Sequence, residues 1–165
     1  LRHKRVVSKI EEFGPGSSFH RVLWDDAETP SGEKVKLVSD DKIKRVIVCS
    51  GKVYYDLYEE RERREINDIY LLRVEQLYPF PAKSLMTELQ RFTQAEIVWC
   101  QEEPKNMGAW TFMEPNIESV LDQVGARYRR PRYAGRPASA ATAVGLMSKH
   151  NQQLNQLLSD ALKID

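Results

Sequence analysis

Three short runs rich in β-branched and aliphatic residues, each followed by apolar residues at helical spacing, restrict this chain to folds in which strands and helices alternate. The runs cover Arg45–Gly51, Ile69–Val74 and Ala95–Gln101. A helix that connects two such strands places them parallel in one sheet. The pattern therefore predicts a mostly parallel sheet with helices on both faces.

Two weaker strand signals flank this pattern. One covers Phe19–Trp24, in a segment rich in glycine, proline and serine, and the other is the basic stretch around Tyr128–Tyr133. Residues 1–34 are therefore interpreted as an interdomain connection with one short strand. Residues 35–165 are interpreted as the α/β domain itself.

The composition is that of one folded domain. The chain has 165 residues, of which 41% are hydrophobic, so a single core suffices. Its 25 basic and 24 acidic residues give a net charge of +1, which provides no global attraction to nucleic acid or to an anionic membrane. No apolar run approaches the ~20 residues of a membrane-spanning helix. We expect a soluble chain with no nucleic-acid partner and no membrane partner.

The segment Ile97–Trp110 (IVWCQEEPKNMGAW) joins a buried strand to a polar loop and the start of a helix. Functional loops of open α/β sheets follow the carboxyl ends of their strands, and this loop carries Glu102 and Glu103. Paired carboxylates can perform acid/base chemistry. Because adjacent strand residues point to opposite faces, we favour an anchoring or interdomain role for this pair.

Three motifs in one order resemble a known family. They are RVEQLYPFP at Arg73–Pro81, the segment Ile97–Trp110, and YAGRPASAATAVG at Tyr133–Gly145. Together they resemble the C-terminal domain of the thiamine-dependent first component of 2-oxoglutarate dehydrogenase. The opening LRH at Leu1–His3 also fits, since a segment of this kind ends the family's pyrimidine-binding domain. The resemblance covers nearly the whole chain.

The resemblance implies a fold in the α/β class. It is a three-layer αβα sandwich with a mostly parallel five-stranded sheet, its first strand antiparallel, like the transketolase C-terminal domain. In that arrangement the strand ending at Cys49 lies beside the strand ending at Cys100. The two thiols are then expected to be close, reduced and unbonded, as is usual in a reducing compartment.

The resemblance also implies a function for the full-length protein. Such an enzyme decarboxylates 2-oxoglutarate on thiamine diphosphate with magnesium, and it transfers the succinyl group to the lipoyl arm of a second component in the tricarboxylic acid cycle. It works as a homodimer in the bacterial cytoplasm or the mitochondrial matrix. The family's GDG signature for the diphosphate and metal does not occur in this sequence. We therefore expect no catalytic, cofactor-binding or metal-binding residue here, and no activity of the isolated chain.

Two other interpretations remain open. A first component acting on 2-oxoadipate would share the fold and differ in pocket residues outside this sequence. The chain could also be an autonomous, non-catalytic module that binds a protein through its Gln101–Trp110 loop. An upstream region with the GDG signature would distinguish both enzymes from the module.

Polar and glycine-bearing segments at two strand ends are the predicted contact sites. We expect the loop Gln101–Trp110 to pack on the pyrimidine-binding domain and Tyr133–Ala138 to lie near the subunit boundary. Arg136 suits a fixed carboxylate partner across an interface. The predicted interdomain or dimer contact residues are Glu102, Glu103, Asn106, Trp110, Tyr133 and Arg136.

Basic residues around the first helix suggest an effector site. Ser50–Lys52 follows a strand and opens a helix, so its amides and the lysine could hold a phosphate. The alternative is a tight strand-to-helix turn, because no complete phosphate-binding motif is present. The charge run Glu59–Glu65 is predicted to be the exposed end of that helix. The effector hypothesis names Lys52, Arg61, Arg63 and Arg64.

The remaining polar residues are given structural roles. The arginines of Arg127–Arg132 fit an edge strand bonded to acidic loops better than a nucleic-acid surface. His3, His20 and His150 lack metal-ligand spacing. Ser139 is expected to cap the terminal helix.

Overall fold

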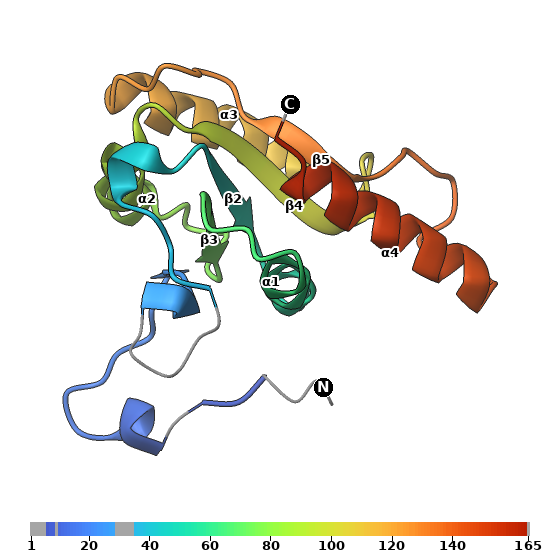
Figure 1. The fold of residues 1–165 in the computed structure, drawn as a ribbon, viewed down its shortest axis with the longest axis horizontal. Helices are drawn as coiled ribbons and strands as arrows, with labels where there is room; N and C mark the ends of the chain where they lie inside the picture. Colours follow the sequence, from blue (N-terminus) through green and yellow to red (C-terminus); the bar gives the residue numbers. More distant parts are fainter. Residues whose placement is uncertain (1–5, 9, 29–34, 165) are drawn as a thin grey trace.

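The computed structural model describes residues 6–8, 10–28 and 35–164, and it contains a five-stranded sheet between two layers of helices (Figure 1). The strand order is β1-β3-β2-β4-β5. Strands β2 to β5 are parallel, and β1 pairs antiparallel with β3. This confirms the predicted sheet. The strands are β1 (Val22–Leu23), β2 (Arg45–Cys49), β3 (Ile69–Val74), β4 (Glu96–Pro104) and β5 (Arg132–Arg136).

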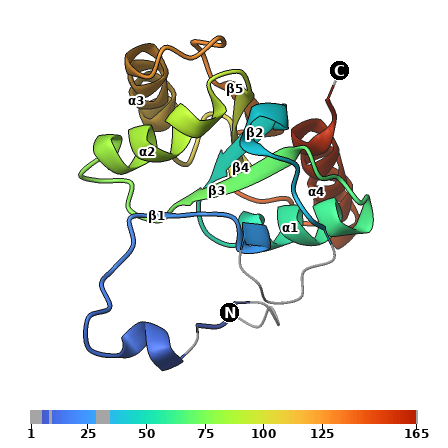
Figure 2. The same ribbon diagram turned by 60° about the vertical axis from the view of Figure 1, so that its left-hand side comes forward.

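In the described part of the chain, four α-helices cover the sheet, two on each face (Figure 2). Helices α2 and α3 pack on one face with the short 3-10 turn η4, and α1 and α4 pack on the other. The helices are α1 (Val53–Arg63), α2 (Ala82–Leu89), α3 (Trp110–Gln123) and α4 (Met147–Leu162). The short 3-10 helices are η1 (Ile10–Phe13), η2 (Asp26–Glu28), η3 (Asp40–Lys42) and η4 (Gln90–Phe92).

Strand β2 explains why the sheet needs a helical layer on both sides. All five of its residues are buried, and alternate side chains enter opposite cores. Val46 and Val48 pack with α2 and α3, whereas Ile47 and Cys49 pack with α1 and α4. A parallel strand covered on both faces is a continuous apolar run rather than an alternating one.

Cys49 and Cys100 are direct neighbours across β2 and β4, and both are buried as free thiols. The predicted proximity of the two thiols is therefore confirmed.

The sequence misplaced three element boundaries. Strand β1 has only two residues, because the Asp25 side chain takes over the pairing beyond it. The fifth strand begins at Arg132 rather than at Tyr128, since the backbone before it turns to bond Thr93. Helix α4 begins at Met147, and Ser139 bonds the amide of Ala141 instead of capping that helix.

The segment before β2 runs along the edge of the sheet (Figure 2). Its described part joins the body through β1, through Asp25 and through η2. The predicted boundary at residue 34 and the side chain of His3 lie outside the described residues. The division into a connection and a domain therefore stays a prediction.

Candidate functional site

The chain reverses direction across the sheet between β2 and β4, and a cavity opens at the carboxyl ends of these strands. From β2 the chain passes through α1 to β3 on one side, and from β3 it passes through α2 to β4 on the other. Such switch points are where open α/β sheets bind ligands or partners. The cavity has a volume of about 620 Å³. Its lining comprises Ser50, Gly51, Lys52, Leu77, Tyr78, Trp99, Gln101, Glu102, Glu103, Gly108, Ala109 and Phe112.

Gln101 organises the loop on the wall of this cavity. Its side chain is 4% exposed, and its Oε1 accepts hydrogen bonds from Trp99 Nε1 at 2.9 Å and from the Trp110 amide at 3.0 Å. The second bond satisfies a free amide at the start of α3. Its Nε2 donates to the carbonyl of Met107 at 2.7 Å. One amide group therefore fixes both the loop and the beginning of the helix.

Gly108 is required for this close packing. Its φ is +67°, and a Cβ at this position would lie 3.0 Å from Gln101 Nε2 and from Glu103 Cβ. Any larger residue would meet both backbone strain and a steric contact.

Glu102 and Glu103 both line the cavity, but they do not form an acid/base pair. Glu102 lies 3.4 Å from Lys52 Nζ, and Lys52 also bonds Asp56 one helical turn away. Glu103 is exposed and contributes its backbone carbonyl to the loop. Burial opposes the charge of Lys52, yet its hydrogen bond with Asp56 and the charge of Glu102 raise its pKa above the ordinary value.

The four residues of the predicted effector site do not come together. Lys52 stands at the first turn of α1, and the arginines stand at the other end, about 15 Å away for a helix of this length. Arg63 and Arg64 both bond Glu60. The hydrogen bond from Arg63 is the largest cause that lowers the pKa of Glu60, and the bond from Arg64 adds to it. Together they lower this pKa to about 2, although partial burial acts in the opposite direction. The structure therefore does not bring these four residues into one site, and effector binding by any of them stays a prediction.

Arg61 is buried rather than exposed, which also corrects the prediction for the charge run Glu59–Glu65. It forms a bidentate ion pair with Asp25, and both side chains are 0% exposed. It also donates to the carbonyl of Ile69 at 3.1 Å. Arg61 therefore holds the segment before β2 against β3.

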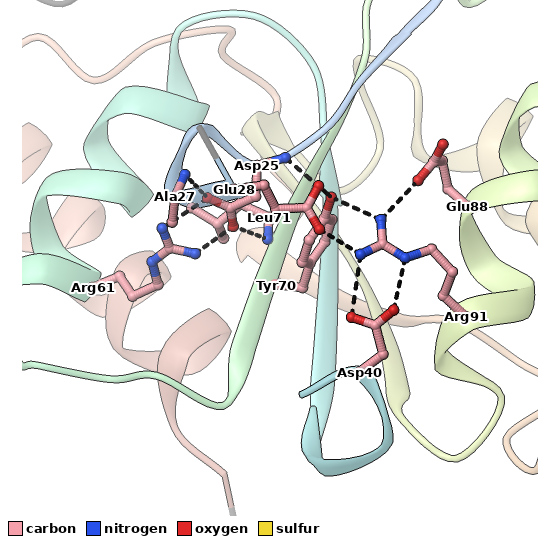
Figure 3. A network of polar contacts seen from close by, with 9 residues as sticks. All are labelled: Asp25, Ala27, Glu28, Asp40, Arg61, Tyr70, Leu71, Glu88 and Arg91. Atoms are coloured by element: carbon pink, nitrogen blue, oxygen red, sulfur yellow. Dashed lines mark hydrogen bonds and ion pairs between the residues drawn. The ribbon is translucent and has the colours of Figure 1, made fainter. Parts of the chain in front are cut away.

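Figure 3 shows how this pair continues into a second arginine cluster. The Asp25 amide approaches the hydroxyl of Tyr70 at 3.2 Å, and that hydroxyl donates to Glu28 at 3.0 Å. Arg91 bonds Glu28 and Asp40, which flank the segment 29–34. Two arginines from the body thus attach the connecting segment at separate points.

The two predicted contact segments lie side by side and are bonded to each other. Asn106 and Ser139 exchange hydrogen bonds, at 2.9 Å from the Asn106 amide group and 3.0 Å to its oxygen. The Tyr133 hydroxyl donates to the Arg136 carbonyl at 2.9 Å, and its ring lies 5.2 Å from that of Trp110. Burial, together with nearby negative charge, raises the pKa of Tyr133 to about 12. We call Gln101–Trp110 with Tyr133–Ser139 the contact face.

Arg136 has no carboxylate partner among the described residues. Its side chain is 7% exposed, and its terminal nitrogen donates to Nδ1 of His150 at 3.1 Å. Its Nε is buried without a hydrogen bond. The predicted carboxylate would have to come from outside the described chain.

The other polar candidates have surface or structural positions. His20 packs edge-on against Trp24. Arg129 and Arg130 pair with Asp122 and Glu118 on α3. Within the described residues, no group of three metal-ligating side chains lies together, and no helix is long and apolar enough to cross a membrane.

A family model described as the 2-oxoglutarate dehydrogenase C-terminal region matches residues 7–162. The chain belongs to this family. The resemblance of the three motifs is therefore confirmed, and the match covers the sheet and all four helices of the 2-oxoglutarate dehydrogenase C-terminal domain.

Two relatives agree with this family. The 2-oxoglutarate dehydrogenase E1 component of Brucella anthropi is 65% identical over 162 residues, and that of Brucella ovis is 64% identical over the same length. Each alignment covers 98% of this chain but only 16% of the relative. The chain thus spans about one sixth of the length of these relatives.

Gln101 and Asp25 were not among the residues that sequence reasoning selected, and Arg61 was selected only for an effector site. Gln101 belongs to the selected loop and directly follows a buried strand, and this position could have indicated that its side chain is buried. Asp25 lies in a segment interpreted as a tether, and no local pattern indicates that a carboxylate there is buried.

Proposed function

We propose that this chain is the C-terminal domain of a 2-oxoglutarate dehydrogenase first component. The observation that carries the proposal is the 65% identity, over 98% of the chain, to a protein of that name. The full-length enzyme would decarboxylate 2-oxoglutarate and transfer the succinyl group to the lipoyl arm of a second component. Preceding domains of the same chain, a second copy in a homodimer and that second component are its proposed partners. The bacterial sources of the relatives favour the cytoplasm over the mitochondrial matrix.

The cavity between β2 and β4 does not fit the diphosphate of thiamine. Glu102 and Glu103 line it, and carboxylates repel a diphosphate unless a metal lies between them. The nearby ammonium of Lys52 is already engaged by Asp56 and Glu102. We therefore assign thiamine diphosphate and magnesium to the rest of the full-length protein.

The domain's own contribution is to contact the rest of the enzyme. Hydrogen bonds of Gln101 and of the Asn106–Ser139 pair hold the contact face together within this chain. Beside it, Tyr78 and Phe112 expose aromatic rings at the cavity. Preformed surfaces with exposed aromatic rings are typical of protein interfaces. We propose that the preceding domains cover the contact face and this cavity.

The first experiment is a substrate assay on the full-length protein that contains this domain. With thiamine diphosphate, magnesium and an artificial electron acceptor, we expect oxidation of 2-oxoglutarate to exceed that of 2-oxoadipate. Faster turnover of 2-oxoadipate would favour the alternative enzyme. No turnover of either acid would favour the interaction module.

The second experiment is hydroxyl-radical footprinting of the same full-length protein. Tyr78 and Phe112 should be oxidised more slowly than their exposure in the isolated fold implies. Tyr128 is a matched control, because it is exposed at the opposite end of the sheet. Equal oxidation of all three rings, in proportion to their exposure, would contradict the proposed cover.

A further inference from the structure

Arg136 is a buried cation whose charge is not balanced within the described chain. An arginine in a protein is always charged, and burial of a charge without a partner is strongly unfavourable. His150 offers only a neutral acceptor, because a guanidinium can donate but not accept. A buried arginine side chain usually forms an ion pair with a carboxylate.

A second unsatisfied atom lies on the helix that packs against Arg136. Helix α4 contacts β5, and His150 and Gln153 stand three residues apart on one face of it. Gln153 Oε1 is buried without a hydrogen bond, as is Arg136 Nε. Buried polar groups without partners are rare in complete structures. Both atoms are already covered in the described fold, so a carboxylate from outside would reach Arg136 through its terminal nitrogens.

The segment around Arg136 has no acidic residue and exposes apolar side chains. From Arg136 to Gln156 its basic residues are Arg136 and Lys149. No residue from Pro137 to Gln156 is fully buried, and Leu146 and Met147 are 68% and 73% exposed. In Figure 1 the first turns of α4 and the preceding loop extend beyond the sheet. We call Arg136–Gln156 the acid-free surface.

This surface fits a protein partner. Exposed methionine and leucine beside a buried arginine, with few other charges, are typical of the centre of an interface. The partner must be acidic where it meets Arg136. A second copy of the same surface is disfavoured, because like charges would oppose each other.

We propose that an aspartate or glutamate from the polypeptide preceding this domain pairs with Arg136, and that its segment packs on the acid-free surface. The proposal rests on the proposed function, since it takes the preceding polypeptide from the long relatives. In them, about five sixths of the chain lies outside the matched C-terminal region. A covalently attached partner is present at high effective concentration.

The test uses the full-length protein with a photoactivatable amino acid in place of Met147. We expect cross-links to peptides upstream of this domain, each with an acidic residue nearby. Lys83 on α2 is the control position, because it is exposed on the opposite face of the sheet. The same cross-links from Lys83, or cross-links from Met147 only to another copy of the acid-free surface, would overturn the proposal.

Charge reversal then tests the ion pair itself. Arg136→Glu should reduce the upstream cross-links by roughly tenfold or more. Reversing the identified carboxylate to arginine in the same protein should restore them. Unchanged cross-links in Arg136→Glu would overturn the pairing. Circular dichroism checks that the variants fold, and Arg136→Met provides a milder variant if charge reversal prevents folding.

Anion binding by the site is the competing outcome. Titration of the full-length protein with inorganic phosphate should leave the Met147 cross-links unchanged. If phosphate abolished them in the unmodified protein but not in Arg136→Met, the site would be an anion site and the proposal would be wrong. A full-length protein that oxidises 2-oxoglutarate but gives no upstream cross-link would refute this inference alone. Lack of activity would instead refute the proposed function.

Discussion

The carboxylate of Asp25 accepts a hydrogen bond from the backbone amide of Leu71 at 2.7 Å. Leu71 belongs to β3, whose outer edge is paired by β1 only at Arg73 and Val74. Farther along that edge, a side chain takes the place of a strand. The negative charge is balanced by the buried Arg61, so a short connecting segment can cover the sheet edge.

Loss of the Arg61 charge should destabilise the domain strongly. Arg61→Met leaves the Asp25 carboxylate buried without its cation, and breaking a buried pair costs about 3–5 kcal/mol. Urea unfolding measures the difference. Arg129→Met is the control, since Arg129 and its partner Asp122 are both exposed and its loss should change stability by about 0.5 kcal/mol or less. Similar losses in both variants would contradict the assigned role of the pair.

Gln101 should contribute to stability through the groups that it satisfies. Gln101→Leu leaves Trp99 Nε1 and the Trp110 amide unpaired, at a cost of about 1–3 kcal/mol for each buried group. We expect a lower urea midpoint and a shift in tryptophan fluorescence. Gln123→Leu is the control, because Gln123 bonds only its own helix on the surface. Equal midpoints for the two variants would show that the loop does not need Gln101.

The two thiols should be unreactive in the folded domain. Burial raises the pKa of Cys49 and of Cys100 well above the ordinary value, so neither forms a thiolate near neutral pH. Labelling with iodoacetamide at pH 8 should be slower than in urea by roughly a hundredfold or more. Mass spectrometry follows both sites. Rapid labelling of the native protein would mean that β2 and β4 open locally.

Glu60 should make the domain sensitive to acid. Its pKa falls to about 2 in the folded state, compared with ~4.3 in an unfolded chain. A lowered pKa means that the stabilisation is complete above pH ~4.3 and is lost as the pH falls towards 2. Over this range the wild type should therefore lose more stability than Glu60→Gln. Carbon NMR of the Glu60 carboxyl gives the midpoint directly, and a value near 4.3 would contradict the prediction.

The sheet could be predicted from the sequence because its signals are local. The run Ile69–Val74 coincides with β3, and the order of strands and helices follows from alternating periods. The placement of Cys49 beside Cys100 followed from the family resemblance and is confirmed by the register. Each of these features depends on residues that are close in sequence or on a topology that few chains can avoid.

The polar interior could not be predicted in the same way. Arg61 lies in a run of charges that is typical of an exposed helix end, and its burial depends on Asp25, which is 36 residues away. Gln101 is buried because a loop folds over it. Such long-range bonds leave no periodic mark in the sequence. The contact residues and the carboxylate partner of Arg136 stay predictions.

The cover on the edge of β3, formed by β1 and Asp25, limits how far the chain can be shortened. A bare strand edge is a template on which another chain can add a strand, and proteins cover such edges to prevent aggregation. Here the cover is two paired residues and one carboxylate. A shortened chain that lacked residues up to 25 would lose the carboxylate that pairs with Arg61 and also present the bare edge of β3 to strands of other molecules, so it should unfold more easily and polymerise.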